Sequence, residues 1–188
     1  MRFSKEQLQR FAEWKSVVPG FRHDVAYNDN QAIHHHILPL VAEITASRQI
    51  TSHQFEDGGL SNYFAFFLHY SSDLPEFSNI EYDGVEVLGV TVYLSLLAPV
   101  GVFGRSSSFI GARCWSWGYL EISDVLNASE AEGELERSLL SAISKTPYQL
   151  LSRTDIAEPL PAGVHPYEYC FCEEPWDKVF HALFTNTD

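Results

Sequence analysis

The sequence predicts an α+β fold: an antiparallel β-sheet meander with helices packed on one face. Two observations lead to this prediction. Strand patterns are grouped between helical patterns instead of alternating with them, which argues against a parallel sheet. From Val85 onward, aliphatic residues occupy the even positions Leu88 to Leu96, while Gly, Thr, Tyr and Ser occupy the odd positions between them. At 188 residues the chain fits one domain, residues 1–188.

Two helices are expected before the sheet. The first covers residues 4–17, because Ser4 and Gln7 form a capping box and apolar residues then recur at helical spacing. The second covers the apolar pattern at residues 33–44. Pro39 falls inside it and cannot donate a backbone hydrogen bond, so we expect this helix to kink or restart there.

Three strands are expected in the middle of the chain. The aromatic and aliphatic run Tyr63–Tyr70 is too short for a free helix and predicts a buried strand. The second strand begins at Val85, and Cys114–Ile122 has the composition of a third. The intervening stretch, Gly101–Gly111, is rich in Gly and Ser and predicts a turn or flexible loop. The three strands are expected to form the antiparallel meander.

The last third of the chain predicts two more helices and one strand. Ser129 with Glu132 forms a capping box that opens the third helix. Three prolines and a glycine predict a surface loop at residues 153–166, and alternating aromatic residues predict a short strand at residues 167–171. The final helix is expected to start at Pro175 and its preceding glutamate, because Pro is favoured at the first helical position.

Charge is the main functional indication in the sequence. Acidic residues outnumber basic residues 25 to 12, which gives a net charge of −13. Such a surface repels nucleic-acid phosphates and anionic lipid headgroups, and it attracts basic proteins and speeds their encounter. We therefore expect a basic protein partner, and neither a nucleic acid nor a membrane.

The sequence also predicts a cytoplasmic location. The first ten residues contain four charges and no apolar run, so no secretory or transit signal is expected from them. The most apolar stretch, Val85–Phe103, is interrupted by polar residues and reads as strand instead of membrane span. Three cysteines, an odd number, agree with a reducing compartment.

No catalytic, cofactor-binding or metal-ligating set is predicted. His34, His35 and His36 are consecutive, and on a helix their side chains diverge by about 100°, so they cannot chelate one ion together. Whether they bind a metal in another way stays open. Cys170 and Cys172 are separated by one residue, whereas redox and zinc motifs use two, so free thiols are expected.

Two acidic segments are candidates for partner binding. For the first segment, the structural interpretation is solvation and helix-dipole complementarity at a helix start, and in the second segment Trp176 is equally compatible with a core position. The alternative is a docking surface whose carboxylates raise the association rate, with an aromatic anchor in the second segment. The candidate residues are Asp124, Glu130, Glu132, Glu134 and Glu136 in the first segment, and Glu173, Glu174, Trp176 and Asp177 in the second.

The C-terminal stretch Trp176–Phe184 resembles the aromatic terminal helix of some small cytoplasmic immunity proteins of bacterial toxin systems. The similarity covers nine of the 188 residues. The resemblance implies a single α+β domain, without a cofactor, that neutralises a toxin by occluding its active site. It transfers no catalytic residues.

Two hypotheses follow from the sequence. The first is a non-enzymatic acidic binding protein, most concretely an immunity protein that neutralises a toxin domain by direct protein–protein binding. The alternative is a small hydrolase or ligand-binding enzyme whose acid–base residues lie far apart in the sequence. A deep pocket with two carboxylates, or with a histidine–carboxylate pair of shifted pKa, would favour the alternative. Both hypotheses are compatible with a homo-oligomer.

Overall fold

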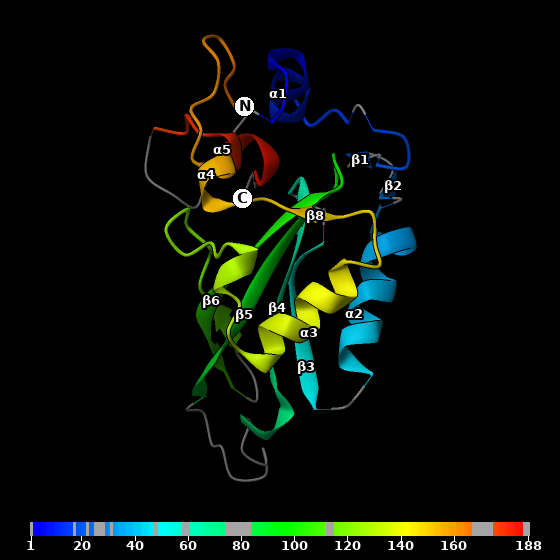
Figure 1. The fold of residues 1–188 in the computed structure, drawn as a ribbon, viewed down its shortest axis with the longest axis vertical. Helices are drawn as coiled ribbons and strands as arrows, with labels where there is room; N and C mark the ends of the chain where they lie inside the picture. The colour runs from blue at the N-terminus through cyan, green and yellow to red at the C-terminus, as the bar shows by residue number, and fades with distance from the viewer. Residues whose placement is uncertain are drawn as a thin grey trace.

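A computed structural model of the chain confirms the α+β fold and the antiparallel sheet (Figure 1). It describes residues 2–16, 18–21, 23–24, 29–30, 32–46, 49–57, 61–73, 84–111, 115–166 and 175–185. The expected strand at residues 167–171 lies outside these residues, as do Cys114, Cys170 and Cys172.

The central sheet is a meander in which each strand pairs antiparallel with the next. Its strands are β3 (Ile50–Asp57), β4 (Tyr63–Tyr70), β5 (Val85–Ser95), β6 (Val100–Ile110) and β7 (Trp115–Trp117). The short β8 (Gln149–Leu150) pairs in parallel with the start of β6. A separate two-stranded ribbon joins β1 (His23–Asp24) to β2 (Asp29–Asn30). The strands expected at residues 63–70 and from Val85 are confirmed, and β7 is the short core of the third.

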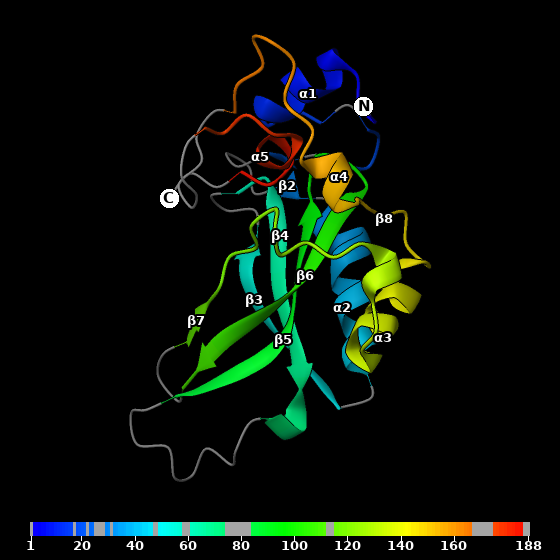
Figure 2. The ribbon, with the colours of Figure 1, turned by 60° about the vertical axis from the view of Figure 1, so that its left-hand side comes forward.

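One face of the sheet is covered by two helices, as predicted (Figure 2). They are α2 (Leu38–Thr45), which continues the π-helical turn η2 (Ile33–Ile37), and α3 (Glu134–Ile143). The even positions of β5 face them, so Val90, Val92 and Leu94 are buried in the same cluster as Leu40 and Leu139. The period of two in β5 therefore marks its helix-covered face.

A second core lies on the opposite face, at one end of the sheet. There α1 (Lys5–Ala12) and α5 (Val179–Leu183) pack together, and α4 (Arg153–Ile156) lies beside α5 (Figure 1). Tyr63 and Tyr93 present their rings to this core, with ring centroids 4.6 Å apart, and Phe184 packs against both. Helices therefore cover both faces at this end of the sheet, and the chain ends are joined there.

The prediction that residues 101–111 form a loop is wrong, because residues 101–110 belong to β6, an inner strand of the sheet. The Gly and Ser residues of β6 allow neighbouring segments to pack closely against the strand; they do not form a flexible loop. A Cβ added to Gly104 would lie 2.4 Å from the carbonyl oxygen of Asp124, because the chain segment that contains Asp124 runs along the strand at this point. The hydroxyl group of Ser106 lies 2.7 Å from that of Thr91 on β5, so the two strands are also linked by a side-chain hydrogen bond. Gly and Ser are needed where other chain segments approach the strand.

The first helix is capped as expected but ends earlier than residue 17. Ser4 and Gln7 form the predicted capping box. The helix stops at Ala12 because Trp14 adopts a left-handed conformation, with φ of 57°. The Lys15 N–H then bonds the Arg10 carbonyl at 2.7 Å and the Trp14 N–H bonds the Phe11 carbonyl at 2.9 Å. This is a Schellman ending, which satisfies the last carbonyls of the helix.

Pro39 interrupts the second helix as expected. The chain forms the π-helical turn η2 before the proline and restarts as α2, with Pro39 in its first turn. The backbone stays helical across this junction, since the Leu38 N–H bonds the Ile33 carbonyl, and the wider π-helical turn lies directly before the residue that cannot donate.

Two expected helix starts are wrong. Ser129 and Glu132 do not open the third helix; instead Asn127 and Glu130 cap the short 3₁₀ turn η5 (Ala128–Glu130), and α3 begins after Gly133. The last helix begins at Val179 instead of Pro175. Among the described residues, no helix is both long and apolar enough to cross a membrane.

Candidate functional site

The helix-covered face of the sheet is longer than the helices that cover it. The strands β5 and β6 have 11 residues each, so each spans roughly 35 Å. The helix α3 has 10 residues and spans only roughly 15 Å. Figure 2 shows the far ends of β5 and β6 running away from α3. Part of this face is therefore left uncovered beyond the start of α3.

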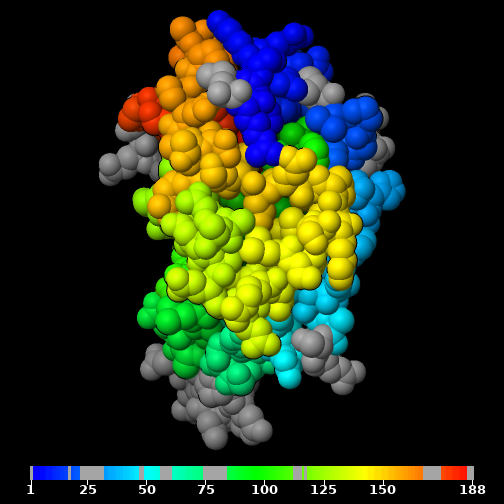
Figure 3. All heavy atoms as spheres, viewed as in Figure 1, coloured from blue at the N-terminus to red at the C-terminus, as the bar shows by residue number. Residues whose placement is uncertain are grey.

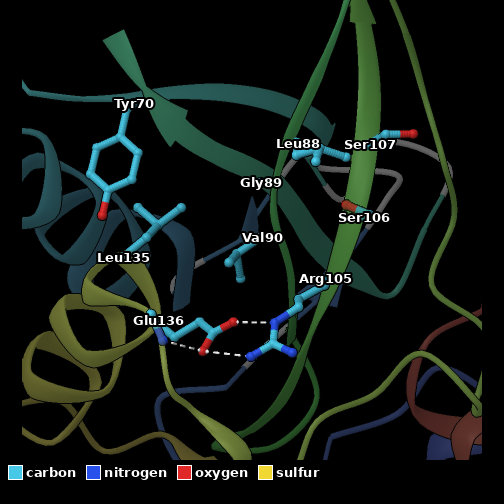
Figure 4. A pocket seen from close by; sticks show the side chains of 10 residues that line it. Tyr70, Leu88, Gly89, Val90, Arg105, Ser106, Ser107, Leu135 and Glu136 are labelled. Carbon is cyan, nitrogen blue, oxygen red and sulfur yellow. Dashed lines mark hydrogen bonds and ion pairs between the residues drawn. The ribbon is translucent and has the colours of Figure 1, made fainter. Parts of the chain in front are cut away.

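A groove of about 450 Å³ lies where the sheet emerges from under α3 (Figure 4). We call it the α3 groove. Its walls include Tyr70 from the end of β4, Leu88 and Val90 from β5, Arg105 from β6, and Leu135 and Glu136 from the first turn of α3. Apolar side chains line most of it, and one ion pair closes one side. Such a lining suits a ligand with apolar groups.

A second hollow, of about 340 Å³, adjoins the groove further along the sheet. Glu86 and Phe109 line it, and Ser107 borders both spaces. Leu88 is 76% exposed and Phe109 is 39% exposed. In the space-filling view, strand atoms in green lie at the surface beside α3 and the segment that precedes it (Figure 3).

The ion pair in the groove joins β6 to α3. Arg105 donates from Nε to Oε1 of Glu136 at 2.6 Å and from Nη2 to Oε2 at 3.2 Å. Oε2 also accepts the backbone N–H groups of Glu132, at 2.7 Å, and Gly133, at 2.9 Å. The Glu136 carboxylate thus caps the helix while it holds the arginine.

The hydrogen bonds at Glu136 determine its ionisation. Glu136 is 4% exposed, and the bond from Arg105, followed by those from the two backbone N–H groups, lowers its pKa. The same contacts raise the pKa of Arg105, to which the nearby charges of Glu132 and Glu130 also contribute. The carboxylate of Glu136 therefore has a structural role, since it links Arg105 to the start of α3. We do not include Glu136 in the proposed partner-binding surface.

The structure places three other candidates of the first acidic segment around the same arginine or at the adjacent helix start. Glu132 and Glu134 are exposed, and Glu134 lies in the first turn of α3. Glu130 is half-buried; its side chain accepts the Asn127 N–H at 2.6 Å and lies 3.7 Å from Arg153. Carboxylates at a helix start interact favourably with its dipole.

Asp124 lies earlier on the same segment, beside β6. Its Oδ2 accepts the Glu121 N–H at 2.9 Å, which stabilises the turn over residues 121–124, and the side chain is exposed. The backbone next to it forms an isolated bridge between Val125 and Gly104. Asp124 thus borders the acidic surface without lining the α3 groove.

The second acidic segment belongs to a different part of the molecule. Trp176 is partly buried and packs against the core that contains α1 and α5, and Asp177 forms an ion pair with Lys178 at 3.2 Å. Glu173 and Glu174 lie outside the described residues. Figure 1 shows α5 at one end of the molecule, with α3 in front of the sheet. In the part of the chain that the structure describes, the two predicted acidic segments therefore lie apart.

Among the described residues, His53 and His69 form a close pair on the sheet face opposite α2 and α3. The Nε2 atoms of His53 and His69 lie 3.0 Å apart, and His69 Nδ1 lies 2.7 Å from the Tyr70 carbonyl oxygen. Since a carbonyl only accepts, His69 Nδ1 carries a proton and His53 donates to His69 Nε2. Partial burial lowers the pKa of both imidazoles, which matches a neutral pair. These hydrogen bonds are sufficient to explain why His53 and His69 lie together.

The described part of the chain contains no group of three or more His, Cys, Asp or Glu side chains that could hold a metal ion. His34 and His35 are exposed on η2, and the ring of His36 stacks on Phe21 at a centroid distance of 5.6 Å. The rings of His35 and His36 lie 6.3 Å apart between centroids, at an interplanar angle of 66°.

The residues most exposed at the candidate site were missed by the sequence analysis. The alternation in β5 marks Leu88 as one more core residue, in line with Val90 and Val92. Arg105 and Phe109 lie in the segment expected to be a loop. Only the length of α3 relative to β5 could have indicated the uncovered end, and that required the correct helix start.

We compared the chain with family models, with curated proteins and with solved structures, and none of the three comparisons found a match.

Proposed function

We propose that this protein is a non-enzymatic acidic binding protein, which holds a basic protein partner at the α3 groove and the carboxylates beside it. The observation that carries the proposal is the position of an exposed apolar residue, Leu88, in a groove whose Arg105 lies near the exposed carboxylate of Glu132. An apolar centre with a charged rim is the usual composition of a protein–protein interface.

The charge of the chain supports a cationic partner. With a net charge of −13, the protein attracts basic surfaces over distances of about 8–10 Å or more in dilute salt. Rim carboxylates act mainly on the association rate, whereas the buried centre of an interface controls dissociation. Asp124, Glu130, Glu132 and Glu134 supply such a rim along one continuous segment.

The most specific form of the proposal is an immunity protein that acts in the cytoplasm by covering the active site of a cognate bacterial toxin. The resemblance of Trp176–Phe184 to the terminal helix of such proteins supports it. A nuclease toxin would provide the required charge, because proteins that bind phosphate backbones are basic at their active surface. An acidic inhibitor can then compete directly with the nucleic acid.

The α3 groove favours binding over acid–base catalysis. A general acid at neutral pH needs a carboxyl group whose pKa is raised, usually by burial without a cationic partner. Arg105 and two backbone N–H groups hold the pKa of Glu136 below its ordinary value instead. The carboxylate that faces this groove is therefore stabilised in its charged form and already hydrogen-bonded.

The proposal predicts that a gene beside this one encodes a secreted protein with a toxic C-terminal domain, and that domain is the partner to purify and test. The two purified proteins should bind, and the association rate constant should fall steeply as salt rises from 50 to 500 mM, because screening weakens the attraction. Co-expression should protect cells from the toxic domain. If the purified pair does not associate at low salt, or if the protein turns over a small substrate, the proposal is wrong.

A matched pair of charge reversals locates the surface. Glu132→Lys lies at the proposed rim, whereas Glu6→Lys makes the same change in net charge on α1, at an exposed position. We expect Glu132→Lys to reduce the association rate about tenfold and Glu6→Lys to reduce it less than threefold. Equal effects would show that only the overall charge matters, and not this surface.

A further inference from the structure

At the uncovered end of the sheet, two apolar side chains lie at the surface and not in the core. Along β5, the side chains on the helix-covered face change abruptly in exposure, from 3% at Val90 to 76% at Leu88. Phe109, at 39%, lies on β6 on the same face. The change occurs where α3 begins, so these residues are left at the surface by the length of the helix.

Leu88 and Phe109 are close enough to bind one ligand segment. Leu88 pairs with Ser107 and Glu86 pairs with Phe109, so the two apolar residues are diagonal neighbours on adjacent strands. Such neighbours are roughly 7–8 Å apart. Ser107 lies between the α3 groove and the adjoining hollow, so the two spaces form one continuous surface. Two apolar side chains of a partner helix, four residues apart, have a comparable spacing.

The charged groups beside this surface indicate which partner fits. Glu86 is exposed and lines the hollow with Phe109, and Glu132 is exposed at the start of α3. A second copy of this chain would bring its own −13 charge to the same surface, and like charges oppose such pairing. A cationic segment instead gains from both the carboxylates and the apolar residues.

We infer that Leu88 and Phe109 anchor an amphipathic segment of the basic partner, with apolar side chains facing the sheet and Lys or Arg side chains reaching Glu86 and Glu132. This inference rests on the proposed function and specifies the chemistry of the partner. The two exposed apolar residues determine how long the complex lasts, whereas the carboxylates determine how fast it forms.

Two synthetic peptides of equal charge serve as probes. One is a 16-residue peptide of Lys and Leu, with the Leu residues on one helical face, and the other has Gln in place of each Leu. Fluorescence anisotropy measures their affinities, and amide chemical shifts locate the binding surface on the ¹⁵N-labelled protein. We expect the Leu peptide to bind at least tenfold more tightly, with the largest shifts at residues 86–90, 105–109 and 132–136.

Substitutions at exposed positions distinguish specific binding at Leu88 and Phe109 from nonspecific hydrophobic binding. Leu88→Gln and Phe109→Gln should each weaken the Leu peptide at least fivefold and leave the Gln peptide unchanged. Leu38→Gln is the matched control, because Leu38 is also an exposed apolar residue, at 42%, but lies on α2. It should change neither affinity. Leu88→Gln should keep the wild-type unfolding midpoint, whereas Phe109→Gln and Leu38→Gln should each lower it slightly and by a similar amount, because both residues are partly covered.

The outcomes distinguish this inference from the proposed function. If both peptides bind equally and Glu132→Lys weakens both, the acidic surface binds cations but the apolar anchor is wrong. If neither peptide binds at low salt, both the inference and the proposed function fail. A concentration-dependent dimer that Leu88→Gln dissociates would also overturn the inference, because the surface would then be occupied by a second copy of the chain.

Discussion

Asn62 and Thr185 are linked by a reciprocal pair of main-chain and side-chain hydrogen bonds across 123 residues of sequence. The Asn62 N–H donates to the Thr185 carbonyl at 3.0 Å, and the Thr185 N–H donates to Asn62 Oδ1 at 2.8 Å. Asn62 Nδ2 also donates to the Ala182 carbonyl at 3.2 Å. Both residues are fully buried, just before β4 and just after α5. One amide side chain thus attaches the C-terminal helix to the sheet.

Replacing Asn62 by Ala should destabilise the protein by about 3 kcal/mol, because it leaves the Thr185 N–H and the Ala182 carbonyl buried without this partner. Urea unfolding monitored by tryptophan fluorescence measures the change. Thr185→Val is the control: it removes the hydroxyl bond to His181 but keeps both bonds to Asn62, so it should cost about 1 kcal/mol. Equal losses in the two variants would contradict the role assigned to Asn62.

Glu136 and Glu134 offer a comparison within one turn of α3. Glu136→Ala removes a buried carboxylate that accepts four hydrogen bonds, and it should lower the free energy of unfolding by about 2 kcal/mol. Glu134→Ala changes an exposed side chain and should have an effect within about 0.5 kcal/mol. Chemical denaturation of both variants at pH 7 provides the measurement. A loss of the same size at Glu134 would mean that helix charge, and not the bonded carboxylate, is responsible.

Two glycines test the close packing around β6. A Cβ at Gly104 would lie 2.4 Å from the Asp124 carbonyl oxygen and 2.8 Å from a Leu120 methyl group. Gly104→Ala should therefore cost about 2 kcal/mol, as overpacking usually does. At Gly118 the nearest atom would be 3.5 Å away, so Gly118→Ala should be close to neutral. Thermal unfolding of the two variants under identical conditions separates these outcomes, and a tolerated Gly104→Ala would contradict the close approach.

His181 makes stability depend on pH. Burial lowers its pKa to about 4, and its Nδ1 accepts the Lys178 N–H at 3.2 Å, which requires an unprotonated nitrogen. A pKa that is lower in the folded state means that the unfolded chain binds the proton more readily. The contribution is therefore complete above about pH 6.5 and is lost as pH falls toward 4, by about 3 kcal/mol in total.

The variant His181→Asn isolates this effect, because its amide oxygen can accept the same N–H without titrating. The free energy of unfolding of this variant should fall less between pH 6.5 and pH 4 than that of the wild type. The difference in slope should approach about 1.4 kcal/mol per pH unit, the value for one proton. His53 and His69 are present in both proteins, so their lowered pKa values do not contribute to the difference. Parallel profiles would show that His181 titrates normally in the folded protein.

Local patterns predicted the elements whose burial follows from composition. The aromatic run at Tyr63–Tyr70 and the alternation from Val85 correspond to β4 and β5, and the capping box at Ser4 begins α1. These signals are strong because neighbouring residues alone produce them. β3 was missed, since Ile50–Asp57 is mostly polar and pairs only with β4 among the described strands. A strand at a sheet edge needs fewer apolar residues than a central strand.

The remaining features depend on contacts between distant segments. Gly and Ser in β6 look like loop residues until Asp124 is seen against Gly104. Trp14 ends α1 in a conformation that Gly usually adopts, so the sequence contained no stop at that position. The acidic residues near α3 were identified by charge alone, whereas the apolar half of the candidate surface, Leu88 and Phe109, became visible only when α3 proved shorter than the strands beneath it.

The packing of α1 against α5 has a consequence during synthesis on the ribosome. Leu8 and Phe11 leave the exit tunnel early, but their partners Phe180 and Phe184 are made more than 160 residues later. At about 5–20 residues per second, the apolar side of α1 stays exposed for many seconds. The final docking of α1 against α5 therefore follows the translation of α5.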